Sequence, residues 1–106
     1  MSSSAIELNV PLATNVEVTE DTLTVDLSDG RTISVPLAWY PRLGHATVEE
    51  RSTWSLIGRG EGIHWPQLDE DISVEALIAG KASGESQQSF GKWLSERTSS
   101  RTPPSR

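Results

Sequence analysis

The residues best suited to chemistry lie between positions 64 and 71. His64 is followed by the acidic run Asp69-Glu70-Asp71, and an imidazole beside a carboxylate can act as a general base or hold a metal. The competing interpretation is structural. An apolar neighbour on each side predicts a strand in which His64 points to the opposite face, and the acids would add negative charge at the start of a following helix. We favour the structural interpretation, and a small enzyme or ligand-binding protein using His64 with Asp69 or Asp71 is the alternative.

Two further patterns suggest ligands but lack essential parts. His45 and Glu49 have the i, i+4 spacing of paired metal ligands, yet a structural zinc site usually needs four. The run Gly58–Gly62 resembles a phosphate loop, but no lysine followed by serine or threonine completes it, and Glu61 would repel phosphate. We therefore predict no metal, no nucleotide and no other cofactor.

Aromatic and arginine residues offer a protein-binding surface. Trp39, Tyr40 and Arg42 fall within four positions, and Arg51 follows. Such residues dominate core packing, but they are also the types most enriched at interface hot spots. Our hypothesis is that residues 39–42 form an exposed edge which, with Arg51, anchors a protein partner.

A second aromatic group lies near the C-terminus. Phe90, Trp93 and Leu94 recur at helical spacing in a segment too short to be a stable helix alone. These residues therefore either dock on the parent domain or lie in a partner's groove.

The elements that must position these residues begin with strands. Between residues 15 and 35, apolar side chains recur at every second position in three runs, which is strand periodicity. Asp29-Gly30 is a hairpin signal, because glycine adopts positive φ without a Cβ clash. We expect a three-stranded antiparallel meander with one polar face and one covered face.

The covering elements should be short. Thr47 with Glu50 matches a capping box, which predicts a helix over 48–54, and Ser73 with Gly80 predicts a helix over 74–79. Extended pieces at 55–57 and 62–65 add one or two later strands, and prolines on both sides of 37–40 favour a turn or a short 3₁₀ segment. The expected fold class is α+β: a small antiparallel sheet covered by two short helices, with a C-terminal helical segment.

Length and composition favour one domain. The chain has 106 residues and no cysteine, so packing alone must stabilise it. We expect a domain over 1–80, a linker over 81–88, a short amphipathic helix over 89–97 and a disordered tail over 98–106.

The charge distribution bears on partners and location. Residues 1–80 carry four basic and thirteen acidic side chains, a net −9, whereas residues 81–106 carry five basic and two acidic ones, a net +3. An acidic body disfavours nucleic acid, so nucleic-acid contact through Arg97, Arg101 and Arg106 is only a weaker alternative. The chain starts without a basic and then apolar leader, and no apolar run is long enough to cross a bilayer, so we expect a cytoplasmic protein.

Three strings carry a family resemblance: Pro36-Leu37-Ala38-Trp39-Tyr40-Pro41-Arg42-Leu43, Gly62-Ile63-His64-Trp65-Pro66 and Leu68-Asp69-Glu70-Asp71-Ile72-Ser73. Over roughly residues 14–80 the chain resembles the bacterial domain of unknown function 2442 family. The resemblance implies a compact α+β fold with a small sheet. Family members often look like partners of another small bacterial domain, as in toxin and antitoxin pairs. Some carry an added DNA-binding domain, which we do not find here.

These observations predict a non-enzymatic protein-interaction module, with an antitoxin-like role as its specific form. The expected partner-binding residues are Trp39, Tyr40, Arg42, Arg51, Phe90, Trp93 and Leu94. An outer strand of the meander could also pair with a second copy of the chain, because unpaired backbone groups make sheet edges adhesive.

Overall fold

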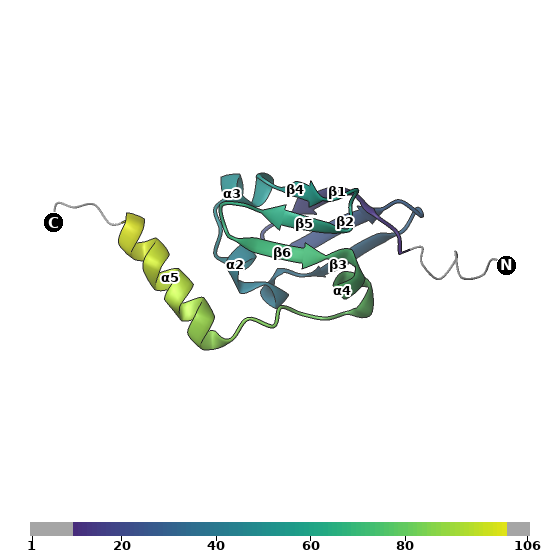
Figure 1. The fold of residues 1–106 in the computed structure, drawn as a ribbon. Helices are drawn as coiled ribbons and strands as arrows, with labels where there is room; N and C mark the ends of the chain where they lie inside the picture. Colours follow the sequence, from purple (N-terminus) through teal and green to yellow (C-terminus); the bar gives the residue numbers. More distant parts are fainter. Residues whose placement is uncertain (1–9, 102–106) are drawn as a thin grey trace.

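The computed structural model describes residues 10–101, with side chains as far as residue 97. Its first sheet is the expected meander, made of β1 (Ala13–Val18), β2 (Thr22–Leu27) and β3 (Thr32–Pro36), paired antiparallel in that order (Figure 1). Alternate residues of β2 are buried, so one face of this sheet points into the core.

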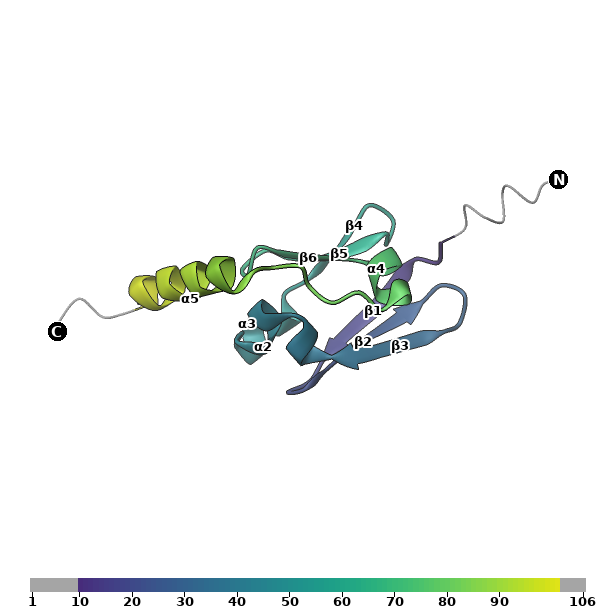
Figure 2. The ribbon, with the colours of Figure 1, turned by 90° about the horizontal axis from the view of Figure 1, so that it is seen from below.

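A second sheet covers that face, where helices alone were expected. β4 (Ser55–Ile57), β5 (Gly62–Trp65) and β6 (Glu70–Ser73) pair antiparallel in chain order. Figure 2 shows the two sheets as separate layers. The predicted α+β class is confirmed. Three strands follow the meander where one or two were expected, because acidic residues that were assigned to the start of a helix belong to β6.

The core lies between the two sheets. One connected cluster of buried residues draws on both sheets and on the short helices. Trp65 is fully buried, and its indole Nε1 donates a hydrogen bond of 3.1 Å to the carbonyl oxygen of Arg51. Core packing therefore accounts for this tryptophan. The cluster comprises Ala13, Val16, Leu23, Val25, Leu27, Val35, Leu37, Tyr40, Leu43, Ile63, Trp65, Leu68, Ile72, Val74 and Leu77.

A glycine allows the two sheets to approach each other closely. Gly60, in the β4–β5 turn, has φ of +119°, and its carbonyl oxygen accepts a hydrogen bond of 2.8 Å from the backbone N–H of Ala13 at the start of β1. A Cβ on Gly60 would lie 2.6 Å from the carbonyl oxygen of Ala13. Only glycine satisfies both the dihedral angle and the contact.

Short helices connect the strands. Leu37–Trp39 form a 3₁₀ turn, η1, as the prolines on both sides of residues 37–40 predicted. η1 leads into α2 (Pro41–Gly44). The capping box of α3 (Val48–Ser52) is confirmed, with both reciprocal hydrogen bonds between Thr47 and Glu50 formed.

The second predicted helix has the expected bounds. It is α4 (Val74–Ala79), capped by the Ser73 hydroxyl, which accepts a hydrogen bond from the Ala76 N–H, and ended by Gly80 at φ of +73°. Both signals identified in the sequence therefore act as predicted.

The C-terminal helix is longer than expected. α5 (Gln87–Arg101) starts two residues before 89, so residues 87 and 88 belong to it and not to the linker. The Ser86 hydroxyl accepts a hydrogen bond of 3.0 Å from the Ser89 N–H, a capping contact that the sequence analysis overlooked. Residues 98–101, expected to be disordered, are helical, and residues 102–106 lie outside the described part of the chain. No helix between residues 10 and 101 has both the length and the apolar character to cross a membrane.

Candidate functional site

One edge of the second sheet has unpaired backbone groups. The N–H of Val74 donates to the carbonyl oxygen of Glu61 across β5 and β6. Hydrogen-bonded pairs alternate along an antiparallel ladder, so Ile72 and Glu70 bond to β5. The backbone N–H groups of Asp71 and Ser73 must then face the outer edge, and within residues 10–101 no backbone carbonyl accepts from either of them. β6 is therefore an open edge strand.

A groove of about 420 Å³ runs along this edge, and we call it the β6 groove. Its far wall is the segment between α4 and α5, which follows the free side of β6 (Figure 1). Two hydrogen bonds tie that segment to the end of η1 and to Tyr40, which follows it. The Ser83 N–H donates to the Trp39 carbonyl, and the Tyr40 hydroxyl donates to the Lys81 carbonyl. The groove is lined by Tyr40, Ile57, Glu61, Gly62, Glu70, Asp71, Ile72, Ser73, Ala76, Lys81, Ala82, Ser83 and Gly84.

An acid without a hydrogen-bond donor lies in the β6 groove. Glu70 is 9% exposed, and none of the described groups donates a hydrogen bond to its carboxyl. Burial raises the pKa of Glu70 from its ordinary value of 4.5 to about 7, against the lowering effect of Arg42. Glu85, Asp71 and Asp69 add a further rise, so a cation placed beside this carboxyl would favour its ionised form.

Replacing Glu70 with Gln is expected to stabilise the protein above pH 7. Because the pKa of Glu70 is raised in the folded state, folding loses free energy as the pH rises from about 4.5 to about 7, and the penalty is complete above that range. The variant should gain about 2 kcal/mol at pH 8 and nothing at pH 4, a value reduced for residual solvation. Urea unfolding at both pH values measures this, and an equal effect at pH 4 and pH 8 would contradict it.

His64 and Asp71 meet on the outer face of the second sheet. They are direct partners across β5 and β6, and Nδ1 of the imidazole is hydrogen-bonded to Oδ1 of the carboxylate. Ser55 stands opposite His64 on β4, so three polar residues form a row across the strands. The pair is solvent-accessible, with 37% and 66% of the side chains exposed. The Asp69 side chain, 92% exposed, lies apart from this pair, and an enzyme using His64 with Asp71 stays a prediction.

The expected exposed edge at residues 39–42 is wrong for two of its members. Tyr40 is 3% exposed, and its hydroxyl donates to the Lys81 carbonyl. Arg42 donates to both carboxylate oxygens of Glu85, at 2.6 to 3.1 Å, and to the carbonyl oxygens of Leu68 and Asp69. Trp39 is half-buried. The polar groups of Tyr40 and Arg42 therefore form hydrogen bonds within the fold. They connect this segment to the residues just before β6 and to the segment that precedes α5.

Arg51 likewise serves the fold. Its guanidinium donates to the carbonyl oxygens of Leu43, Gly44 and Thr19, at 3.0 to 3.4 Å. It therefore satisfies the last carbonyls of α2 and ties that helix to the end of β1.

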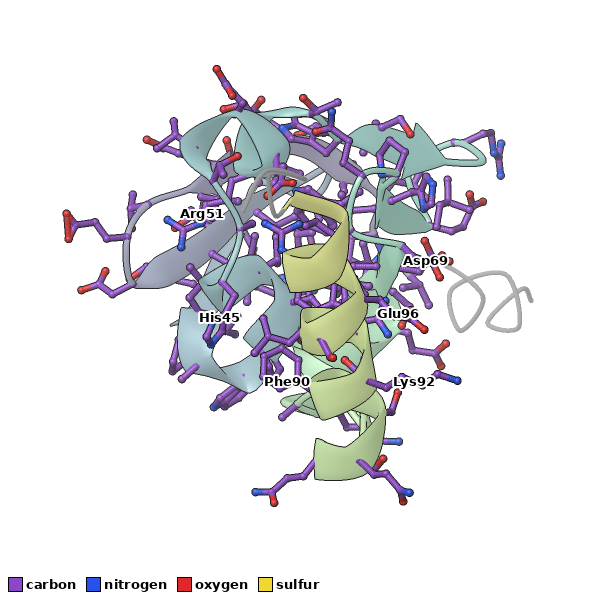
Figure 3. All side chains as sticks on the ribbon, turned by 90° about the vertical axis from the view of Figure 1, so that its left-hand side faces the viewer. His45, Arg51, Asp69, Phe90, Lys92 and Glu96 are labelled. Carbon is purple, nitrogen blue, oxygen red and sulfur yellow. The ribbon has the colours of Figure 1, made fainter. Side chains whose placement is uncertain are left out.

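The C-terminal aromatic residues dock on the parent domain, one of the two arrangements left open above. Phe90 lies 5.2 Å from the ring of His45, and in Figure 3 both lie on one side of α5, with Lys92 on the other. The Trp93 ring contacts two guanidinium groups, with its centre 5.1 Å from that of Arg42 and 4.9 Å from that of Arg97. Cation–π attraction of this kind contributes about 0.5–2 kcal/mol per contact. Leu94 is half-buried beside them.

A second ion pair fastens α5. Arg97 donates to both carboxylate oxygens of Glu50, at 2.7 and 2.9 Å, and both side chains are less than one-fifth exposed. These hydrogen bonds lower the pKa of Glu50 from 4.5 to about 2. Arg97 is thus occupied in the fold, which weakens the nucleic-acid alternative, while the side chains of Arg101 and Arg106 lie outside the described part.

The other sequence candidates take structural positions. His45 follows α2 and Glu49 lies in the first turn of α3, and both are exposed. Among the described residues, no group of three or more His, Cys, Asp or Glu side chains is placed to hold a metal ion. Gly58–Gly62 forms the β4–β5 turn and the start of β5, not the start of a helix.

Sequence analysis missed Glu70 as an inward-facing acid. Glu70 and Ile72 are two residues apart and are both buried, so strand alternation was the available signal. It was obscured because three consecutive acids before Ser73 also match the start of a helix. The partners Glu85 and Glu50 of the two arginines had no local signal, since each pair spans more than 40 residues.

The comparisons with solved structures agree with this fold. A protein of unknown function from Rhodospirillum rubrum is 29% identical over 73% of this chain and 95% of its own, with a TM-score of 0.62. The uncharacterized protein CV0863 from Chromobacterium violaceum is 19% identical over 91% of this chain and 88% of its own, with a TM-score of 0.61. No curated protein matches the sequence.

A family model settles the relationship suggested by the tryptophan-containing strings. It is described as a protein of unknown function, DUF2442, and it matches residues 13–83. The matched range contains both sheets and α4 and ends inside the segment that lines the β6 groove. The chain therefore belongs to the DUF2442 family.

Proposed function

We propose that this protein is a non-enzymatic protein-binding module that takes up an extended segment of a partner along β6. The observation that carries the proposal is the open edge of β6 with a groove beside it. An exposed edge strand is a template for another strand, and many peptide-binding domains add their ligand in this way. The antitoxin-like form of this role stays a prediction.

The dimensions of the β6 groove suit such a ligand. A volume of about 420 Å³ falls within the roughly 300–1,000 Å³ range of ligand pockets. The four residues of β6 span about 13 Å, so a partner segment of four or five residues could pair along it. Apolar surface in the groove comes from Tyr40, Ile72 and Ala76. The free N–H groups of the strand edge would orient the backbone of the ligand.

Replacing Asp71 with Pro is expected to weaken the binding of an extended ligand strongly. Proline removes the outward N–H and places its ring where the added strand would lie, yet it is tolerated at an edge strand whose N–H faces away from the sheet. Peptides selected from a random heptapeptide library on the full chain should bind the variant about tenfold more weakly or worse. Isothermal titration with the selected peptides measures this loss.

Asp71→Ala is the matched control, because it removes the carboxylate but keeps the N–H. This variant also removes the hydrogen-bond partner of His64. If it still binds the peptides, binding in the groove does not depend on the His64–Asp71 pair. If no peptide is selected, or if the Pro and Ala variants bind alike, the proposed function is wrong.

A further inference from the structure

The β6 groove is acidic. Its lining residues include three acids, Glu61, Glu70 and Asp71, and one base, Lys81, and of the three acids Glu70 is the buried one. The nearby Arg42 offsets the effect of burial on the pKa of Glu70 only in part, and its guanidinium donates its hydrogen bonds to Glu85 and to the carbonyl oxygens of Leu68 and Asp69. Glu61 pairs with Arg59 and Asp71 with His64, so a ligand that enters this groove meets Glu70 as the acid without a hydrogen-bond partner among the described residues.

The geometry of an added strand places one ligand side chain beside Glu70. Directly opposite residues of neighbouring strands point to the same face with Cβ atoms about 5 Å apart. The ligand residue opposite Glu70 would thus point inward, toward the carboxyl and Tyr40, and the residue opposite Ile72 would point the same way. The residue opposite Asp71 would point outward, to the face that carries His64.

The strands of a second copy supply no cation for this position. None of the six described strands contains Lys or Arg, whereas Glu17, Asp26, Glu70 and Asp71 all lie in strands. A like charge opposite a carboxylate is destabilising. Charge complementarity therefore favours a different protein over a copy of this chain.

We infer that the occupant of the β6 groove is an extended segment of a different protein that places a Lys or Arg side chain opposite Glu70. This inference rests on the proposed function and adds the chemistry of the partner. A small apolar residue two positions away meets Ile72 and Ala76. The recognised sequence is thus an alternation of a basic, a variable and an apolar residue.

Three peptides test the inference at pH 8 with the full chain. They share one heptapeptide sequence of alternating Thr and Val and differ only at the centre, which is Lys, Gln or Glu. Titrations followed by the backbone amide signals of Asp71 and Ser73 in NMR spectra give the affinities. The Lys peptide should bind about fivefold more tightly than the Gln peptide, and the Glu peptide most weakly.

Glu70→Gln should remove the preference for the Lys peptide over the Gln peptide, so the ratio of the two affinities should fall to about one. Glu17→Gln is the matched control, since it removes one negative charge from an exposed position of β1 and should keep the preference. Equal binding of all three peptides would overturn the inference and leave the proposed function standing. No binding by any peptide would refute both, and dimerisation that shifts the Asp71 and Ser73 amides would identify a second copy as the occupant.

Discussion

Replacing Gly60 with Ala is expected to lower the free energy of unfolding by about 3 kcal/mol or more. A non-glycine residue at φ of +119° is strained by about 1–3 kcal/mol. The new Cβ would also lie 2.6 Å from the Ala13 carbonyl oxygen, so β1 and the β4–β5 turn would have to separate. That movement breaks the hydrogen bond from Ala13 N–H to the Gly60 carbonyl. Urea unfolding followed by tryptophan fluorescence measures the loss.

Substitutions at two other glycines distinguish the backbone strain of Gly60→Ala from its steric clash with Ala13. Gly30 has φ of +96° and open space around its Cβ position, so Gly30→Ala should show the backbone strain alone, about 1 kcal/mol. Gly84 has neither a positive φ nor a neighbour within 4 Å, so Gly84→Ala should be neutral. If Gly60→Ala costs no more than Gly30→Ala, the close approach of the two sheets is not a constraint.

Arg42→Ala should cost about 2–3 kcal/mol of stability and release α5 from the domain. The change removes the contacts to Glu85, to two backbone carbonyls and to the face of Trp93. Glu85 would be left as a nearly buried charge without its partner, and loss of one member of such a pair is strongly destabilising. Hydrogen exchange of the α5 amides, measured together with urea unfolding, should show both effects.

Arg31→Ala is the comparison for an arginine that matters little. Its ion pair with Asp29 is exposed, with 55% and 41% of the side chains accessible, and such pairs contribute about 0–1 kcal/mol. Arg42→Lys should recover only part of the loss, because an ammonium cannot donate to two carboxylate oxygens and two carbonyls in the fork geometry of guanidinium. Wild-type protection of the α5 amides in Arg42→Ala would show that the helix is held by other contacts.

The sequence was sufficient to predict elements that depend on local signals. The alternation along β2, the capping box at Thr47 and the Ser73 and Gly80 ends of α4 each act within a few residues. The second sheet was not predicted as a sheet, because β4, β5 and β6 are three or four residues long and a short apolar run fits a strand or a turn equally well.

The candidate site was predicted less well than the fold. His64 does face away from its buried neighbours, as strand alternation indicated. The β6 groove, however, arises from three segments far apart in the sequence: the turn at Tyr40, the strand at Glu70 and the segment from Lys81 to Gly84. No periodicity or motif in the sequence indicates that these segments meet. The sequence likewise gives no signal for the ion pairs of Arg42 with Glu85 and of Arg97 with Glu50, which place both arginines within the fold.

Two ion pairs join α5 and the segment before it to the rest of the domain, and their charges are arranged in opposite order. Arg42 reaches from the family core to Glu85, whereas Arg97 reaches back from the helix to Glu50. Because the family match ends at residue 83, the core contributes one cation and one anion to this junction, and the C-terminal extension contributes their counterions. A different extension could use the same junction by presenting an anion to Arg42 and a cation to Glu50.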